Sequence, residues 1–133
     1  MSLLRTLTVI SHRGLRYPVE LFSPDTRFAD AGAVYLYLAS RSGGEAQVIY
    51  VGDAECLDRQ IAADRRPGGL WHRAEAMGFD TIGALALARP EDRQTITRDF
   101  AMTWNPPCND GHAGRGLGLF APPFGSGRHD MAR

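Results

Sequence analysis

The feature that most constrains this fold is a pair of strand-like runs on either side of a glycine loop. Residues 33–39 read AVYLYLA and residues 47–51 read QVIYV, with Ser-Gly-Gly at residues 42–44 between them. Runs rich in β-branched and aromatic residues favour strands, and two of them around a short glycine loop predict an antiparallel hairpin. Gly52 follows the second run and ends it. The sequence therefore predicts a hairpin at the centre of the fold.

Helices and one further strand are predicted after this hairpin. A first helix begins at Asp53 as its N-cap and places Leu57 and Ile61 on one face. A second helix covers residues 70–77, a strand covers residues 81–87, and a third helix runs from Pro90 to the proline pair at residues 106–107. This order predicts an α+β fold, with a small three-stranded, largely antiparallel sheet flanked by helices.

The two ends of the chain differ in composition from the middle. Residues 1–31 form an N-terminal extension with two extended stretches, residues 6–10 and 17–22, and Pro18 makes the second an edge strand at best. Residues 32–109 form the domain itself, and residues 110–133 form a Gly/Pro-rich tail. The length of 133 residues suits one domain of this kind.

Composition narrows the classes of function. The formal net charge is 0 and every basic residue is arginine, so a nucleic-acid partner would have to be bound by a local arginine patch. No apolar run approaches the roughly 20 residues that cross a bilayer, which predicts a cytoplasmic protein without a membrane partner. Cys56 and Cys108 are far apart in the sequence and belong to no Cys/His cluster of metal-ligand spacing.

Three short motifs within residues 32–109 occur in a specific order. Ala33-Val34-Tyr35 and Tyr50-Val51-Gly52 are similar to the "GIY" and "YIG" elements of the GIY-YIG nuclease superfamily, with 15 positions (50 minus 35) between the tyrosines. The segment from Asn105 to Asn109, which reads NPPCN, is similar to the ending that follows the last helix of that family. By order and spacing the chain resembles a GIY-YIG domain.

The resemblance implies a chemistry and the residues that would carry it. Members of the family cut phosphodiester bonds with one divalent metal, using the two tyrosines, an arginine on the first helix and a glutamate on the last. Here Tyr35 and Tyr50 are present, but Gln60 occupies the arginine position and Thr97 the glutamate position. A neutral hydroxyl cannot replace a carboxylate at a Mg²⁺ site without losing most of its charge. The sequence thus predicts a degenerate member with no metal site.

Two further residues join Tyr35 and Tyr50 as catalytic candidates. Arg59 is adjacent to Gln60 and is a candidate for the catalytic arginine; alternatively, it forms a surface ion pair with Glu55. His72 lies in the second helix, where histidine can act as a base or phosphate ligand, and its alternative role is packing beside Trp71.

Arginines also cluster around the first two helices. Arg65, Arg66 and Arg73 are the candidate nucleic-acid-binding residues, and the first two precede a Pro-Gly-Gly loop that could contact phosphates. Acidic residues are interleaved with them, so a solvated face of mixed charge is the alternative.

Two hypotheses about function follow. In the first, the chain is a non-catalytic GIY-YIG-like domain that binds DNA, RNA or a protein partner and needs no cofactor. In the alternative, it is a Mg²⁺- or Mn²⁺-dependent DNA endonuclease with relocated charges, in which Arg59 and a carboxylate such as Asp99 or Asp58 serve the reaction.

Overall fold

A computed structural model describes residues 3–112 of the chain, so most of the Gly/Pro-rich tail expected at residues 110–133 lies outside the described residues. The strands are β1 (Leu3–Ile10), β2 (Arg16–Phe22), β3 (Ala33–Ser40), β4 (Ala46–Ala54) and β5 (Thr81–Ala86). The helices are α1 (Leu57–Asp64), α2 (Leu70–Ala76), α3 (Pro90–Trp104) and α4 (Pro107–His112), and a single 3₁₀ turn (Ser42–Gly44) closes the β3–β4 hairpin.

All five strands form one antiparallel sheet in the order β1-β2-β5-β3-β4. The α+β class and the antiparallel sheet are confirmed, but the predicted number of three strands is wrong. The difference arises because Glu20, Leu21 and Phe22 of β2 pair with Ala84, Gly83 and Ile82 of β5. The N-terminal residues therefore add two strands to the sheet that contains the β3–β4 hairpin.

The position of Pro18 shows why β2 can lie inside the sheet. Pro18 pairs with Thr8 of β1 on one side, whereas the pairing of β2 with β5 covers only Glu20–Phe22. Proline has no backbone N–H to donate to a second neighbour, so it is tolerated where the strand is paired on one side only. The strand as a whole is internal, although Pro18 itself lies in a stretch with one neighbour.

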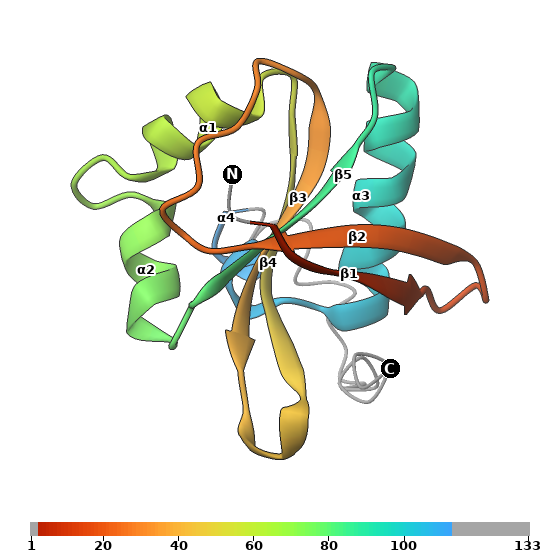
Figure 1. Ribbon diagram of the computed structural model, residues 1–133, viewed down its shortest axis with the longest axis horizontal. Coiled ribbons are helices and arrows are strands. Elements are labelled where there is room, and N and C mark those ends of the chain that lie inside the picture. Colours follow the sequence, from red (N-terminus) through yellow and green to blue (C-terminus); the bar gives the residue numbers. More distant parts are fainter. Residues whose placement is uncertain (1–2, 113–133) are drawn as a thin grey trace.

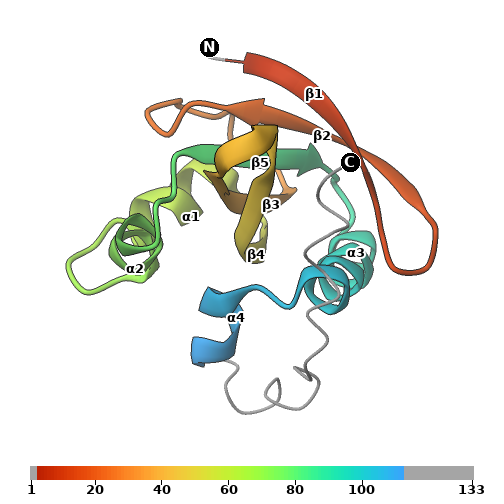
Figure 2. The ribbon, with the colours of Figure 1, turned by 90° about the horizontal axis from the view of Figure 1, so that it is seen from below.

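The helices flank the sheet on opposite sides (Figures 1 and 2). Helices α1 and α2 cover one face, α3 covers the other, and α4 lies beside the edge strand β4. Side chains alternate along β3, so Tyr35 and Tyr37 point toward α1 and α2, whereas Leu36 and Leu38 point toward the α3 side. We call these the tyrosine face and the α3 face.

Each face buries its own apolar core. On the tyrosine face the largest contributors are Tyr35, Tyr37, Ile49, Trp71 and Phe79. On the α3 face, residues of β2, β3 and β4 pack against Phe100 and Trp104 of α3. A sheet with both faces covered explains why β3 is apolar along nearly its whole length rather than alternating between apolar and polar residues.

Helix α1 begins later than the sequence predicted. Strand β4 continues to Ala54, so Asp53 belongs to that strand and the helix starts at Leu57. The Asp53 carboxylate accepts a 2.7 Å hydrogen bond from Arg93 of α3, and Arg93 also donates to the carbonyls of Leu87 and Ala88. Asp53 therefore anchors α3 to the sheet instead of capping α1.

The exposed edge of β4 is capped by a side chain from α4. Asn109 accepts a hydrogen bond from the Val51 N–H and donates one to the Val51 carbonyl, both at 2.9 Å. This side chain takes up two backbone groups that an edge strand would otherwise leave unpaired. None of the helices described between residues 3 and 112 is both long and apolar enough to cross a membrane.

Candidate functional site

A buried carboxyl group lies at the centre of the tyrosine face. Asp64, the last residue of α1, accepts hydrogen bonds from the hydroxyls of Tyr35 at 2.9 Å and Tyr37 at 2.7 Å, both on Oδ2. Gln60 donates its side-chain amide to Oδ1 of the same group at 3.1 Å. Asp64 is only 8% exposed, so these three donors replace the water that a carboxyl group would otherwise bind.

The position of Asp64 follows from helical spacing. Leu57, Ile61 and Asp64 lie at positions i, i+4 and i+7, and this row of the helix faces the sheet. An acidic residue in the third place of an apolar row must find donors inside the protein. The i, i+4, i+7 spacing is the signal that could have identified Asp64, which the sequence analysis did not single out.

Three tyrosines pack around this carboxyl group. The ring centroids of Tyr35, Tyr37 and Tyr50 are 5.5 to 5.8 Å apart. Tyr37 lies directly across from Tyr50 in the β3–β4 pair, whereas Tyr35 lies across from Gly52. The structure therefore brings the predicted pair Tyr35 and Tyr50 together and adds Tyr37.

Gly52 allows the rings to come this close. A Cβ atom at Gly52 would lie 2.6 Å from Cε2 of Tyr50, 2.8 Å from its hydroxyl oxygen and 2.9 Å from Cε1 of Tyr35. The ring of Tyr50 therefore folds over Gly52 along the strand, into space that any side chain would fill. The glycine of the Tyr50-Val51-Gly52 motif has a packing role at this position.

The environment opposes ionisation of every hydroxyl in the cluster. Burial, followed by the nearby Tyr50 and Asp64, raises the pKa of Tyr35 far above its usual value, and burial together with Asp64 does the same for Tyr37. The pKa of Tyr50 is also raised by burial and by Asp64, while a hydrogen bond with Tyr35 and the charge of Arg73 act in the opposite direction. These phenols are therefore poor general bases near neutral pH.

Gln60, at the position where the resemblance places an arginine, is part of this network. Its side-chain amide holds Asp64, so a neutral donor occupies the place of a cation. The other predicted cation, Arg59, projects outward on the same helix with its side chain 78% exposed. Its closest carboxylate oxygen belongs to Asp30, at 3.9 Å, and not to Glu55 as the alternative role supposed.

The predicted histidine lies outside the tyrosine cluster. The His72 side chain is about half exposed, with Nε2 3.1 Å from the Arg65 carbonyl and Nδ1 3.5 Å from Glu75. Its neighbour Trp71 is the buried residue of this pair and packs against Tyr37 and Phe79. In the part of the chain that the structure describes, the ring nitrogens of His72 lie beside Arg65 and Glu75, and no hydrogen bond joins them to Tyr35 or Tyr37.

The three candidate nucleic-acid-binding arginines are held differently. Arg65 lies 4.1 Å over the Trp71 ring and donates to the Pro24 carbonyl, so it is fixed in place. Arg66 has no ion pair within residues 3–112, and it lines a shallow groove of about 350 Å³ together with Arg59, Gln60 and Ala63. Arg73 lies near enough to Tyr50 to lower its pKa. Arg66 thus shares the groove beside α1 with Arg59, whereas Arg73 lies near Tyr50.

Thr97 lies on the opposite side of the sheet from the tyrosines. It belongs to α3, which packs through Phe100 and Trp104 on the α3 face. Its hydroxyl oxygen is buried without a hydrogen-bond partner among the described residues. The sheet therefore separates the glutamate position of the resemblance from Tyr35 and Gln60.

The two carboxylates considered as replacements are both engaged elsewhere. Asp99 lies on α3, with Oδ1 3.0 Å from Nε2 of His12 and Oδ2 3.4 Å from the hydroxyl of Tyr17. Asp58 faces away from the tyrosines and accepts hydrogen bonds from Arg27 and from the Phe28 N–H. Neither carboxylate reaches the cluster around Asp64.

The residues of the cluster do not suit a divalent metal. Mg²⁺ and Mn²⁺ are bound through carboxylate oxygens with free lone pairs, usually with several water molecules. Asp64 is enclosed, and both of its oxygens accept hydrogen bonds from Tyr35, Tyr37 or Gln60. Residues 3–112 contain no group of three or more His, Cys, Asp or Glu side chains that could hold a metal ion.

Comparison with known proteins adds no assignment to this geometry. No family model, no curated protein and no solved structure matches the chain.

Proposed function

We propose that this chain is a non-catalytic, GIY-YIG-like domain that binds the sugar–phosphate backbone of a nucleic acid along the groove beside α1. The observation that carries the proposal is the Asp64 network. The Asp64 carboxyl group accepts hydrogen bonds from the hydroxyls of Tyr35 and Tyr37 and from the side-chain amide of Gln60. Tyrosines held in this way have a structural role, because their protons are donated inward and their ionisation is strongly opposed.

The groove supplies the binding surface. Arg59 and Arg66 line it, and two features favour contact with a phosphate backbone: Arg66 has no ion pair in the described residues, and Arg59 has only a long contact with Asp30. Glu55 also lines the groove and reduces its positive charge. We therefore expect weak binding without sequence preference that falls steeply with salt.

A binding assay tests this proposal directly. Labelled single-stranded DNA, duplex DNA and single-stranded RNA of about 20 nucleotides are titrated with the protein and followed by fluorescence anisotropy at roughly 50 and 200 mM salt. The double substitution Arg59→Gln and Arg66→Gln should weaken binding and flatten the salt dependence. The control Arg16→Gln with Arg98→Gln removes the same charge from β2 and α3 and should change binding little. Equal effects of the two pairs, or no binding to any of the three nucleic acids, would contradict the proposed partner and leave a protein partner.

A cleavage assay separates this proposal from the endonuclease hypothesis. The same oligonucleotides and a supercoiled plasmid are incubated with Mg²⁺ or Mn²⁺, and we expect no products. Cleavage that disappears with a chelator and in both Tyr50→Phe and Arg59→Ala would show an enzyme. The double substitution Gln60→Arg with Thr97→Glu should not create activity, because the sheet separates the two positions.

A further inference from the structure

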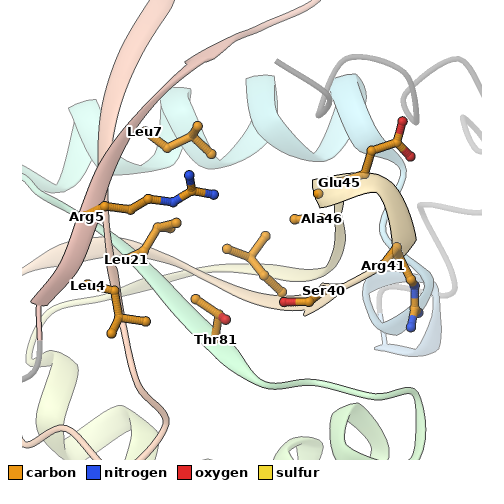
Figure 3. Close-up of a pocket in the computed structure, with 11 residues that line it drawn as sticks. Leu4, Arg5, Leu7, Leu21, Ser40, Arg41, Glu45, Ala46 and Thr81 are labelled. Carbon is orange, nitrogen blue, oxygen red and sulfur yellow. The ribbon is translucent and has the colours of Figure 1, made fainter.

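A groove on the α3 face is left open where α3 does not cover the sheet. It lies between β1 on one side and the β3–β4 hairpin on the other, and its volume is about 290 Å³ (Figure 3). The strands at the two ends of the sheet order, β1 and β4, both line it, so the sheet curves around this space. The groove therefore lies on the face of the sheet opposite to α1 and its arginines.

The inner surface of the groove is apolar. Leu21 and Leu38 are core residues of the α3 face, only 6% and 3% exposed, and they meet the groove from β2 and β3. Leu7 and Ala46 are partly buried beside them, and Leu4 is 59% exposed on the β1 side. An apolar group placed here would be removed from water on several sides.

One cation extends over this apolar surface. The Arg5 side chain runs from β1 into the groove between Leu7 and Leu21, whereas Arg41 and Glu45 at the hairpin end point away from its centre (Figure 3). Arg41 is held outside by Gln47 and by the Met77 carbonyl. Arg5 pairs with Leu21 through the backbone, but within residues 3–112 its side chain has neither an ion pair nor a hydrogen bond. The guanidinium is thus available to a carboxylate that enters the groove.

From this combination we infer that the groove binds a small organic acid, with its carboxylate on Arg5 and its apolar body on Leu7, Leu21 and Leu38. A guanidinium presents paired N–H groups that match the two oxygens of a carboxylate. The volume of about 290 Å³ is near the lower limit for ligand sites, which favours a short chain of about six carbons. This site lies on the other face of the sheet from the groove beside α1, so it stands independently of nucleic-acid binding.

Titrations with three matched probes test the site. Hexanoate, hexan-1-ol and hexylamine share the apolar body and differ in the head group, and amide chemical shifts of the ¹⁵N-labelled protein report where each one binds. We expect hexanoate to give saturable shifts at Leu7, Leu21 and Thr81 with a dissociation constant of the order of 1 mM, and hexan-1-ol and hexylamine to bind about tenfold more weakly.

Three variants identify the groups responsible. Arg5→Gln should weaken hexanoate binding about tenfold, whereas Arg16→Gln, an exposed arginine of β2 that does not line the groove, should leave it unchanged. Ala46→Leu fills the groove while keeping Arg5, so it should also abolish saturation; spectra of each variant without ligand verify the fold. The inference is overturned if hexanoate gives no saturable shifts, if hexan-1-ol binds equally well, or if Arg5→Gln retains full affinity.

Discussion

The two faces of the sheet each contain a buried acidic side chain, and the partners of these side chains differ. Asp64 on the tyrosine face accepts hydrogen bonds from two phenols and one amide, all neutral groups. Asp99 on the α3 face lies 3.0 Å from His12, a group that can carry charge, and 3.4 Å from the hydroxyl of Tyr17. Their exposures are similar, 8% for Asp64 and 4% for Asp99.

The exposure of the partners is what distinguishes the two sites. Tyr35 and Tyr37 are 1% and 0% exposed, whereas the side chain of His12 is 40% exposed. If Asp99 is lost, water can hydrate the exposed part of His12. If Asp64 is lost, the hydroxyls of Tyr35 and Tyr37 remain buried and water does not replace their acceptor. Asp64 therefore stabilises the core itself, while Asp99 links the β1–β2 turn to α3 together with the hydrogen bond from the His12 N–H to Thr103.

High pH should have the largest effect on the free energy of unfolding, because it acts on the tyrosine cluster as a whole. The pKa values of Tyr35, Tyr37 and Tyr50 are raised in the folded protein, chiefly by burial. Above about pH 10 the unfolded chain loses phenol protons that the folded chain keeps, so the free energy of unfolding falls as pH rises. Their contribution is fully present below pH 10, and we expect cooperative unfolding above it.

Two signals recorded together measure this transition. Phenolate absorbance near 295 nm and far-UV circular dichroism should change at the same pH, because the three phenols ionise only when the chain unfolds. The variant Tyr17→Phe, which alters the Asp99 side only, should retain the cooperative transition. Phenolate absorbance from several tyrosines in a chain with native circular dichroism would contradict the closed cluster.

Removal of the carboxyl group of Asp64 or of Asp99 should have the next largest effect on the free energy of unfolding. Asp64→Ala leaves two buried hydroxyls and the Gln60 amide without an acceptor, and we expect a loss of about 3 kcal/mol in the free energy of unfolding. Asp99→Ala should lose only about 1 kcal/mol, because water can hydrate His12. Urea unfolding measures both, and Asp64→Asn, which keeps one acceptor oxygen, should lie between Asp64→Ala and wild type. A larger loss in Asp99→Ala than in Asp64→Ala would refute the comparison.

A methyl group added to one glycine on each face of the sheet tests how tightly that face is packed. Gly52→Ala on the tyrosine face places a Cβ atom 2.6 to 2.9 Å from atoms of Tyr50 and Tyr35, and we expect a loss of about 2 kcal/mol. Gly83→Ala on the α3 face meets Val19 at 3.0 Å and Leu36 at 3.3 Å, and should lose about 1 kcal/mol. Thermal unfolding of the two variants measures the difference, and equal losses would mean that the tyrosine rings can move aside.

Much of the fold could be predicted because it depends on local patterns. The runs at residues 33–39 and 47–51 lie within β3 and β4, the run at residues 81–87 forms β5 up to Ala86, and the helix that starts at Pro90 is present. The pairing of β2 with β5 could not be read from the sequence, because it joins residues about 60 positions apart and no local pattern encodes it. The strand count was therefore too low although the class was right.

The candidate site was also predicted only in part, because local patterns indicate some of its residues and the packing of distant elements determines the others. Tyr35 and Tyr50 meet as the hairpin pattern indicated, and Gln60 reaches the same place. Asp64 was missed although it continues the row of Leu57 and Ile61, because an acidic residue at the end of a helix is usually exposed, and its burial depends on the hydroxyls that β3 supplies. The position of Thr97 depends on which face of the sheet α3 covers, and helical periodicity alone does not contain that information.

Asp58, a carboxylate on the same helix as Asp64 with a side chain 25% exposed, gives the smallest expected effect on stability. Asp58 accepts hydrogen bonds from Arg27 and from the Phe28 N–H, and these hold its pKa at about 2, below the usual value near 4. Because the pKa is lowered in the folded state, the stabilisation is present above about pH 4 and disappears as pH falls toward 2. The Arg27 side chain is 84% exposed, so solvent screens the pair.

The variant Arg27→Gln should therefore unfold at a slightly lower urea concentration than wild type at pH 7 and at the same concentration near pH 2. A difference that persists near pH 2 would show that Arg27 acts through packing. We expect the small effect at pH 7 to disappear near pH 2. Asp58 and Asp64 both accept hydrogen bonds on α1, but the arginine partner of Asp58 is exposed and the tyrosine partners of Asp64 are buried. The exposure of the partners, more than the hydrogen bonds themselves, then determines how strongly each carboxyl group stabilises the fold.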